Sequence, residues 1–464
     1  MQRFTSRFQP RCAIRLSRSI GVRMPGRREI TAVIAASDGS RRRFLGDGGK
    51  AGPSYAISGD LYARKIHSIR RASARTYRSQ EKQRTSGEPS AILYPRLPAP
   101  ILLPPYSRPP PPFSRSPLST MASSYSLFCM GNPLLDIQVN NGEEVLKKYD
   151  LKANDAILAE EKHLSIYEEL PQKYKVTYVA GGAAQNAARG AAYVLPPHSV
   201  VYTGCVGDDS LAEQLKAANK REGLDQVYLV KKGEKTGACA VIITGHHRSL
   251  VTTLRVAEKF EKAHLASPEV APLIDAAKVF YLEGFFLTHG VESALELSKK
   301  ASEASKVFVL NLSAPFIPKF FAVQLQQLIP YCDVIIGNET EAEEWASASG
   351  HADKDLASIA RALATQPKAN PARPRIVIIT HGSKSTTLVS SADPDNAKVY
   401  DVHPLTDAEI VDTNGAGDAF AGGFLGAFVA GKDLEECVEA GHKLGAMCVQ
   451  QIGPQFKWPK VNIL

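Results

Sequence analysis

From residue 124 onwards, short apolar runs rich in β-branched residues alternate with amphipathic stretches. Stretches such as 210–223 and 292–305 have helical periodicity. The buried-strand patterns, each ended by Gly, Asn or Ser, are at 126–132, 198–207, 278–287, 306–313, 332–339 and 375–382. This alternation predicts an α/β fold in three layers, with a mostly parallel central sheet between two layers of helices. Ligands of such folds bind at the carboxyl ends of the strands, where these polar and Gly-rich loops should converge.

Two segments, at about 136–156 and 235–256, interrupt the alternation of strands and helices. The second has the pattern of a hairpin, with Gly245-His246-His247 between two β-rich runs. Together with 176–182 they predict a small α/β lid, built from segments near 136–182 and 235–256, that covers the strand ends and excludes water. The paired histidines are expected to be turn residues, since no third metal ligand is spaced near them.

Residues 1–120 differ in composition from the rest of the chain. They contain 23 Lys and Arg and 6 Asp and Glu, a net charge of +17, whereas the other 344 residues contain 33 and 41, a net charge of −8. Residues 95–117 are rich enough in proline to favour extended, unpacked backbone. We therefore expect a disordered basic extension at 1–120 and a folded domain at 121–464.

Three origins of this extension stay open. The first 28 residues hold eight arginines and no acidic residue, the composition of a mitochondrial presequence. The extension is otherwise a regulatory tail, or upstream sequence that is not normally translated, with Met121 as the true start. We expect a cytoplasmic protein, with the nucleus as a second location, and a mitochondrial protein only if residues 1–120 are a real presequence.

Cysteine and charge patterns exclude several classes of function. The seven cysteines are scattered and form no CxxC pair, which argues against a disulfide framework or a zinc site and favours a reducing compartment. No uninterrupted apolar run reaches the length of about 18 residues that spans a bilayer. Because only residues 1–120 carry a net positive charge, we expect neither a nucleic-acid nor a membrane partner for the folded domain.

The stretch Gly415-Ala416-Gly417-Asp418 opens an apolar helical pattern. It is neither the GxGxxG motif of dinucleotide-binding folds nor a P-loop. Backbone N–H groups at a helix start bind anions, glycines let a phosphate approach them closely, and a neighbouring carboxylate can accept a proton from an attacking hydroxyl. Capping of the helix by Asp418 explains the aspartate equally well on this motif alone. The nearby Asp412 is expected to shape the loop.

Two further glycine-containing stretches follow strand patterns. Gly181-Gly182 precedes a helix of small residues with Gln185 and Asn186 in its first turns, where neutral amides can bind vicinal hydroxyls. Asn132 and Asp136, after the first strand, are suited to present an amide and a carboxylate to a sugar diol. Either stretch alone is equally consistent with a turn. Three such stretches in this order are not explained by turns.

With their neighbours, these three stretches resemble the ribokinase-like family of sugar and nucleoside kinases. The motifs are GNPLLD at 131–136, AGGAAQNAARG at 180–190 and DTNGAGDAFAGGF at 412–424. The resemblance is closest to the adenosine kinases of that family, and it extends to 284–288, 310–316, 337–342 and 440–442, within about 127–456. It implies transfer of the γ-phosphoryl group of MgATP to the 5′-hydroxyl of adenosine, giving AMP and ADP in purine salvage.

The resemblance also implies site residues. The catalytic ones are Asp418 as general base, Gly415, Ala416 and Gly417 with Asn414 as backbone anion hole, and the lid residue Arg248. The residues for adenosine are Asn132, Asp136, Gly182 and Asn186 at the ribose, and Leu250, Leu254 and Phe285 at the base. Those near ATP are Asn338, Glu341, Thr380, His381, Gly382 and His442, and Glu341 also organises water around Mg²⁺.

Some positions depart from the family pattern or have a simpler explanation. Ala183-Ala184 stand where several relatives carry Ser-Thr, and Ala156 stands where animal adenosine kinases carry Gln near the base. These changes are expected to alter affinity or base selectivity and to leave phosphoryl transfer untouched. Phe285 and Phe286 are expected to point to opposite faces of a strand end, one into the core and one toward the cleft.

Two other functions stay open. One is another kinase of this fold, acting on ribose, fructose or a different nucleoside, although the apolar lid residues and Phe285 favour a substrate that carries a base. The other is a nucleoside-binding protein that has lost catalysis, against which the intact Asp418 and Glu341 argue. The resemblance implies a monomer whose partners are the small molecules adenosine and ATP.

Overall fold

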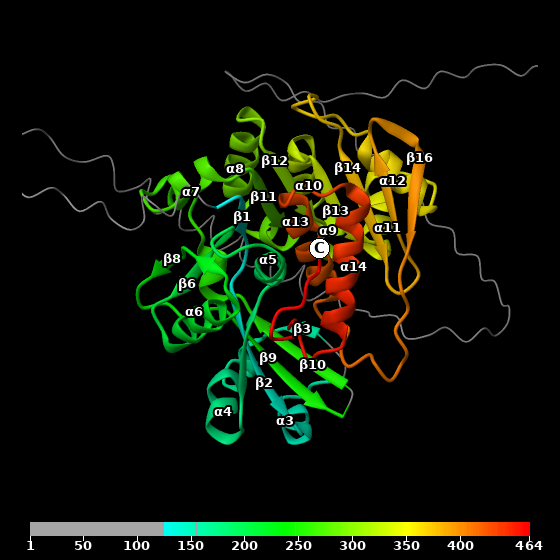
Figure 1. The fold of residues 1–464 in the computed structure, drawn as a ribbon. Helices are drawn as coiled ribbons and strands as arrows, with labels where there is room; N and C mark the ends of the chain where they lie inside the picture. The colour runs from blue at the N-terminus through cyan, green and yellow to red at the C-terminus, as the bar shows by residue number, and fades with distance from the viewer. Residues whose placement is uncertain (1–124, 154–155, 246) are drawn as a thin grey trace, which may run out of the picture. The chain divides into compact units, whose positions relative to one another are not determined.

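The computed structural model of the chain describes residues 125–153, 156–245 and 247–464 (Figure 1). All of them belong to the second of its two structural units, Tyr55–Leu464. The expectations for residues 1–120 therefore lie outside the described residues. Within the described part, no helix is long and apolar enough to cross a membrane. The cysteines of that part are free and buried.

The main sheet has nine strands in the order β16-β15-β14-β13-β12-β11-β1-β5-β7. Neighbouring strands from β7 to β14 are parallel, and β15 and β16 extend the sheet antiparallel at one edge. The strands are β1 (Leu127–Met130), β5 (Val200–Thr203), β7 (Asp225–Gln226), β11 (Val279–Glu283), β12 (Val307–Asn311), β13 (Val334–Asn338), β14 (Ile376–His381), β15 (Ser385–Ser390) and β16 (Asp393–Asp401). Each predicted strand pattern forms one of the parallel strands, which confirms the predicted sheet.

Helices cover both faces of this sheet, because successive strand residues point to opposite sides. Phe280 and Leu282 of β11 belong to one apolar cluster, while Val279 and Tyr281 belong to the other. The first cluster includes α7 (Ala271–Ala276), α8 (Val291–Glu303), α10 (Ala322–Leu328), α11 (Glu339–Ser349) and α12 (Leu356–Ala364). The second includes α5 (Ala183–Val194), α13 (Ala416–Val429) and α14 (Leu434–Val449). These are the three predicted layers (Figure 1).

Glycines bring α13 close to the two helices beside it. A Cβ atom on Gly422 would lie 2.7 Å from the Cα of Gly190 in α5. A Cβ atom on Gly423 would lie 2.4 Å from the carbonyl oxygen of Ala440 in α14. The backbones therefore pack at a distance that only glycine permits. This packing lets the first turns of α5 and α13 meet.

A second sheet has five strands in the order β3-β10-β9-β2-β4. They are β2 (Leu134–Asn140), β3 (Ala156–Leu158), β4 (Thr177–Gly181), β9 (Ala238–Thr244) and β10 (His247–Thr253). The strands β9 and β10 pair antiparallel on either side of Gly245, as the hairpin pattern predicts, although His246 lies outside the described residues. One face of the sheet packs on α3 (Glu143–Lys148) and α4 (Ile166–Lys173). These strands come from the segments that were predicted to form the lid.

Phe286 packs into the core and Phe285 is partly exposed, as expected, but their expected place at a strand end is wrong. The strand β11 ends at Glu283, because the N–H of Gly284 donates to Ser313 Oγ (2.7 Å) and the chain turns into the 3₁₀ helix η5 (Gly284–Thr288). Phe286 is buried, and the ring of Phe285 lies 5.8 Å from that of Phe316.

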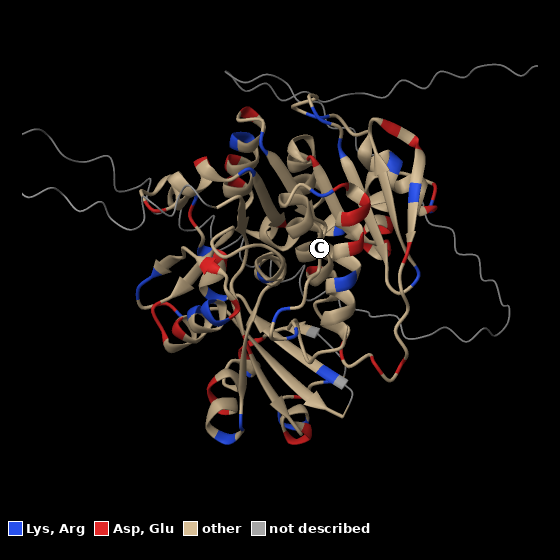
Figure 2. Ribbon diagram, viewed as in Figure 1, with Lys and Arg blue, Asp and Glu red and all other residues tan. Residues whose placement is uncertain are grey.

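The other described elements are shorter or peripheral to the main sheet. They are α6 (Ser210–Glu222), α9 (Phe316–Phe320), the parallel pair β6 (Cys205–Gly207) and β8 (Leu229–Lys231), and the 3₁₀ helices η2 (Glu161–His163), η3 (Arg255–Lys259), η4 (Lys262–Ala266) and η6 (Ile329–Tyr331). Acidic and basic residues are interspersed over the described elements (Figure 2).

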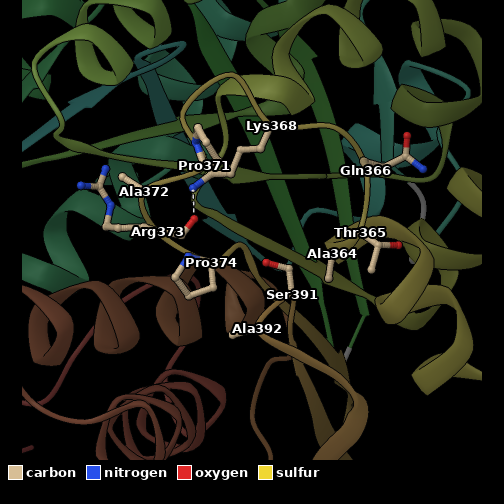
Figure 3. A pocket seen from close by; sticks show the side chains of 10 residues that line it. All are labelled: Ala364, Thr365, Gln366, Lys368, Pro371, Ala372, Arg373, Pro374, Ser391 and Ala392. Atoms are coloured by element: carbon tan, nitrogen blue, oxygen red, sulfur yellow. Dashed lines mark hydrogen bonds between the residues drawn. The ribbon is translucent and has the colours of Figure 1, made fainter.

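A cavity of about 470 Å³ lies beside the start of β14, where Pro374 and Ser391 line it (Figure 3). Its two cations are already paired with one carboxylate. Lys368 Nζ lies 2.6 Å from Asp333 Oδ1, and Arg373 Nη2 lies 3.3 Å from Asp333 Oδ2. Because β14 begins here, the cavity is at the amino ends of the parallel strands, opposite the edge at which ligands are expected.

Candidate active site

Asp418 does not cap the helix that it opens. The N-cap of α13 is Gly415, which has the left-handed φ of 78° that favours glycine, and Ala416, Gly417 and Asp418 follow as the first helical residues. The N-cap makes no side-chain bond, and Asp418 Oδ2 instead accepts a hydrogen bond from Asn186 Nδ2 (2.9 Å) in the first turn of α5. The capping explanation of Asp418 is therefore wrong.

The carboxyl group of Asp418 is ionised with difficulty. Part of the residue remains open to solvent, yet protein surrounds the carboxyl group closely enough that desolvation raises its pKa to about 7. The hydrogen bond from Asn186 and the positive charge of Arg189 act in the opposite direction and lower the pKa. A carboxyl group with a pKa near the working pH suits a general base.

The loop before α13 supplies fewer free amides than the sequence predicted. The N–H of Asn414 donates to Asp412 Oδ1 (3.0 Å), and the N–H of Ala416 donates to the carbonyl oxygen of Thr413 (3.3 Å). Both amides therefore already donate within the loop, and their part in an anion hole stays a prediction. Among the described residues, the amides of Gly415 and Gly417 donate to no protein acceptor, so they remain available for a ligand.

Asp412 ties three segments together. Besides Asn414, it accepts a hydrogen bond from the N–H of Gly453 at Oδ2 (2.7 Å). Arg248 Nη1, from β10 of the second sheet, lies 3.1 Å from Asp412 Oδ2 in a nearly buried ion pair. The expectation that Asp412 shapes the loop is confirmed by these contacts. The same contacts bring Arg248 to the loop that precedes α13.

The second sheet presents one face to this region. Ile137 of β2 and Val251 of β10 belong to the cluster with α3 and α4, so their sequence neighbours point to the opposite face. That face carries Asp136, Arg248 and Leu250, because Asp136 pairs with Cys239, Leu250 with Val241 and Arg248 with Ile243. Cys239, Val241 and Ile243 form a small apolar cluster on which Leu250 packs. Leu254 follows β10 as the N-cap of η3.

Two glycines let the predicted ribose residues come together. A Cβ atom on Gly181 would lie 2.2 Å from Asp136 Oδ1, and one on Gly182 would lie 2.1 Å from the carbonyl oxygen of Asn132. Gly182 also has a φ of 89°, which an L side chain rarely adopts. Burial raises the pKa of Asp136 to about 7, with Arg189 lowering it and Asp418 raising it. Asp136 and Asp418 are therefore close enough to interact electrostatically.

Sequence reasoning missed His289. Its Nε2 lies 2.8 Å from Asn132 Oδ1, while burial lowers the pKa of the imidazole to about 4. The ring is therefore neutral, and Nε2–H donates to the amide oxygen, which leaves Asn132 Nδ2 as the group that can reach a ligand. No feature of the sequence GFFLTHG indicates this contact.

Sequence reasoning also missed Glu283, at the carboxyl end of β11. It is buried, Tyr281 Oη donates to its Oε1 (2.8 Å), and its Oε2 has no hydrogen-bond partner. Burial and the charge of Asp418 raise its pKa well above the ordinary range. The carboxyl groups of Glu283, Asp418 and Glu341 act on one another electrostatically, so ionising all three together is costly without a compensating positive charge.

Asn338 and Glu341 form a capping box at the start of α11. Glu341 Oε2 accepts from the N–H of Asn338 (3.0 Å), and its Oε1 accepts from Asn338 Nδ2 (2.9 Å). Burial raises the pKa of Glu341 to about 7. Among the described residues, no three His, Cys, Asp or Glu side chains are grouped closely enough to hold one metal ion.

The remaining residues predicted near ATP lie at the carboxyl edge of the main sheet and, in the case of His442, within α14. Thr380 pairs with Asn338 across β13 and β14, so Thr380, His381 and Gly382 lie at the carboxyl edge of the sheet. His442 lies within α14, where its Nε2 is 2.8 Å from Thr386 Oγ1 and its ring packs on Phe420. Its polar contact is therefore already used between α14 and β15.

Replacing Gly182 by Ala is expected to raise the KM for the substrate by about tenfold or more, because the added Cβ atom would lie 2.1 Å from the carbonyl oxygen of Asn132 and would displace that residue. The left-handed φ adds strain of about 1–3 kcal/mol, which the control shares. Steady-state kinetics measure the effect. Gly350→Ala is the matched control, since Gly350 has a φ of 75° but open space around it. Equal KM values for the two variants would contradict the prediction.

Comparison with known proteins shows which family the chain is similar to. The pfkB family carbohydrate kinases match residues 144–461. The adenosine kinase of Schizophyllum commune is 70% identical over 343 residues, which cover 74% of this chain and 100% of that protein. The adenosine kinase of Schizosaccharomyces pombe is 43% identical over 340 residues, covering 73% of this chain and 98% of that protein.

Solved structures agree with the sequence matches. The crystal structure of Anopheles gambiae adenosine kinase in complex with P1,P4-di(adenosine-5) tetraphosphate has a TM-score of 0.65 at 40% identity, covering 70% of this chain and 96% of that one. Schistosoma mansoni adenosine kinase in complex with adenosine and AMP has a TM-score of 0.64 at 34% identity, covering 71% of this chain and 97% of that one. The chain therefore belongs to the pfkB family of carbohydrate kinases and, within it, to the adenosine kinases.

Proposed function

We propose that this chain transfers the γ-phosphoryl group of ATP to the 5′-hydroxyl of adenosine, giving AMP and ADP as a step of purine salvage. The observation that carries the proposal is the bond between Asn186 and Asp418. It joins the helix start that carries the candidate base to the helix start beside Asn132 and Asp136. The close relatives are adenosine kinases, which supports the same substrate here.

The proposed chemistry uses the base and the helix start together. Asp418 takes the proton of the 5′-hydroxyl as that oxygen attacks the γ-phosphorus, and ADP leaves. The free amides of Gly415 and Gly417 stabilise charge on the transferred group, since they lie at the positive end of α13. Asn132 and Asp136 bind the ribose hydroxyls and hold the 5′-hydroxyl in reach of Asp418.

The residues at the site fit a divalent cation. Glu283 Oε2 is buried without a partner, and three carboxyl groups repel one another there. Glu341, buried at the start of α11, would hold Mg²⁺ through water. A bound Mg²⁺ supplies charge neutralisation at the phosphates. Thr380, His381 and Gly382 are proposed to lie near the adenosine part of ATP, and Phe285, Leu250 and Leu254 near the base of the nucleoside.

Adenosine-dependent AMP formation tests the function. The full-length chain is incubated with MgATP and adenosine, with ribose and other nucleosides as alternative acceptors. Turnover on adenosine far above that on ribose is expected. Turnover on ribose or another nucleoside alone would replace the substrate and keep the mechanism. Adenosine binding without any turnover would favour a nucleoside-binding protein.

Two further expectations stay predictions. A monomer is proposed, and light scattering of the full-length chain tests it. A cytoplasmic location depends on residues 1–120, which lie outside the described residues.

The value of kcat/KM is expected to fall about tenfold per pH unit below pH 7, because a general base must be ionised to act. The pKa of Asp418 is about 7, so the carboxylate is present above that pH and is lost as the pH decreases. Initial rates between about pH 5.5 and 8.5 measure this acid limb. A limb at pH 4, where an unperturbed aspartate titrates, would contradict a buried base.

A further inference from the structure

Arg189, in α5, is a buried cation that the chemistry above does not use. It is 1% exposed. Its Nε donates to Glu222 Oε2 (2.6 Å), its Nη2 to the carbonyl oxygen of Pro454 (2.8 Å) and its Nη1 to that of Ala180. Burying a guanidinium is costly even when it is paired, and an apolar residue of similar volume often serves packing as well. The position therefore calls for an explanation other than packing.

Arg189 determines which way the amide of Asn186 faces. Arg189 Nη1 lies 3.0 Å from Asn186 Oδ1. A guanidinium can only donate hydrogen bonds, so the atom of Asn186 that faces it must be the oxygen. The amide nitrogen then points the other way, where it donates to Asp418 Oδ2 (2.9 Å). Three residues thus form a directed chain from a fixed cation to the carboxylate of the base.

Glu222 balances the charge at the other end of this chain. It lies at the end of α6, its side chain is 11% exposed, and its Oε2 contacts both Nε and Nη2 of Arg189. The positive charge of Arg189 lowers the pKa of Asp418 and of Asp136. The other titratable groups that interact with Asp418 are Asp136 on β2, Tyr281 and Glu283 on β11, Glu341 on α11 and Cys448 on α14. Arg189 is thus the cation among acidic neighbours.

We propose that Arg189 is a positioning residue for phosphoryl transfer: balanced by Glu222, it fixes the amide of Asn186 so that the amide holds the carboxylate of Asp418 ionised and correctly oriented. The proposal rests on the proposed function, since it assigns a role toward the base of that reaction. It adds two residues, Arg189 and Glu222, that act on the base through Asn186.

Replacing Arg189 by Met tests the charge and the orientation together. Loss of a nearby positive charge disfavours the ionised carboxylate, so the acid limb of kcat/KM should move to higher pH by about one unit. The plateau of kcat should fall by about tenfold or more, because the base is no longer held in place. Arg189→Lys separates the two effects. It keeps the positive charge, so the acid limb of kcat/KM should stay at the pH of the wild type. An ammonium group cannot make the several parallel hydrogen bonds of a guanidinium, so the plateau of kcat should still fall.

Glu222→Gln gives the opposite shift. It removes a negative charge beside Arg189, so the cation acts more strongly on Asp418 and the acid limb should move to lower pH. Arg221→Met is the matched control, because Arg221 is the exposed neighbour of Glu222 in the last turn of α6. Its charge is screened by solvent, and both limb and plateau should equal those of the wild type.

The outcomes distinguish this proposal from the proposed function. Absence of wild-type turnover on adenosine would overturn the function itself. Two results would overturn the role of Arg189 even if the wild type turns over adenosine. One is an unshifted acid limb of kcat/KM in Glu222→Gln. The other is a shift of that limb in the same direction in Glu222→Gln and Arg189→Met. If thermal melting shows that Arg189→Met does not fold, Arg189→Lys and Glu222→Gln decide the question alone. A purely structural role would lower stability without moving the limb in opposite directions.

Discussion

Replacing Asp418 by Asn is expected to lower kcat for adenosine phosphorylation by about 10²–10⁴-fold or more, the usual contribution of a general base. The amide has nearly the same size as the carboxyl group, so the fold should persist. It cannot accept the proton of the 5′-hydroxyl, and it also places a neutral group where Asn186 donates its hydrogen bond. Stopped-time assays of AMP formation and calorimetric titration with adenosine measure turnover and binding separately.

A second aspartate at a helix start is the control for this substitution. Asp433 is the N-cap of α14, where its Oδ1 accepts from the N–H of Glu436 (2.8 Å). Asn caps helices about as well as Asp, so Asp433→Asn should leave turnover unchanged. Turnover of Asp418→Asn within a few-fold of the wild type would remove Asp418 from the mechanism. The kcat/KM of Asp418→Asn should also no longer fall with decreasing pH to the extent that the ionisation of Asp418 causes in the wild type.

Replacing Arg375 by Met is expected to lower the free energy of unfolding by at least about 3 kcal/mol, since several buried carbonyl groups lose a charged donor. Arg375 is fully buried and precedes β14. Its guanidinium donates to carbonyl oxygens of Ile329, Cys332, Leu363, Ala364, Gln366 and Pro367. It thereby joins the end of α12 and the turn η6 to the amino end of the main sheet. Urea unfolding at equilibrium measures the loss.

The control for this prediction is Arg361→Met. Arg361 Nε, in α12, lies 3.3 Å from Asp395 Oδ1, and the side chain of Arg361 is 42% exposed. Replacing it should lower the free energy of unfolding by less than about 1 kcal/mol. Arg375 lies at the opposite end of β14 from Thr380, and the KM values of the folded variant should therefore remain those of the wild type. Identical unfolding midpoints for the two variants would show that the carbonyl cluster contributes nothing to stability.

Local patterns were sufficient for the layers of the fold. Runs such as 306–313 and 332–338 are apolar at their centres and end in Ser and Asn, and they form β12 and β13 of the parallel sheet. The motif at 412–418 likewise predicted a helix start that carries an acidic residue, and α13 begins there. These features depend on residues a few positions apart, so periodicity and turn chemistry report them directly.

The same patterns were less accurate where loops use their own polar groups. The amide of Asn414 was expected to face an anion, but the side chain of Asp412, two residues earlier, accepts its hydrogen bond. Phe285 and Phe286 were expected on a strand, but a bond from Gly284 to Ser313 ends β11 before them. In both places a competing hydrogen bond decided the conformation, and no spacing rule predicts which acceptor a loop amide will find.

The sequence by itself determined the type of fold, the segments that form its parallel strands and the residue types that a phosphotransferase of this family needs. Only the tertiary structure decided how those residues act on one another. Asn186 and Asp418 are 232 positions apart and meet because glycines let α5 and α13 pack closely. The roles proposed for Arg189, Glu222, Glu283 and His289 depend on the same kind of contact. Burial, charge and hydrogen bonding at a site are set by distances in space, and these are independent of distance along the chain.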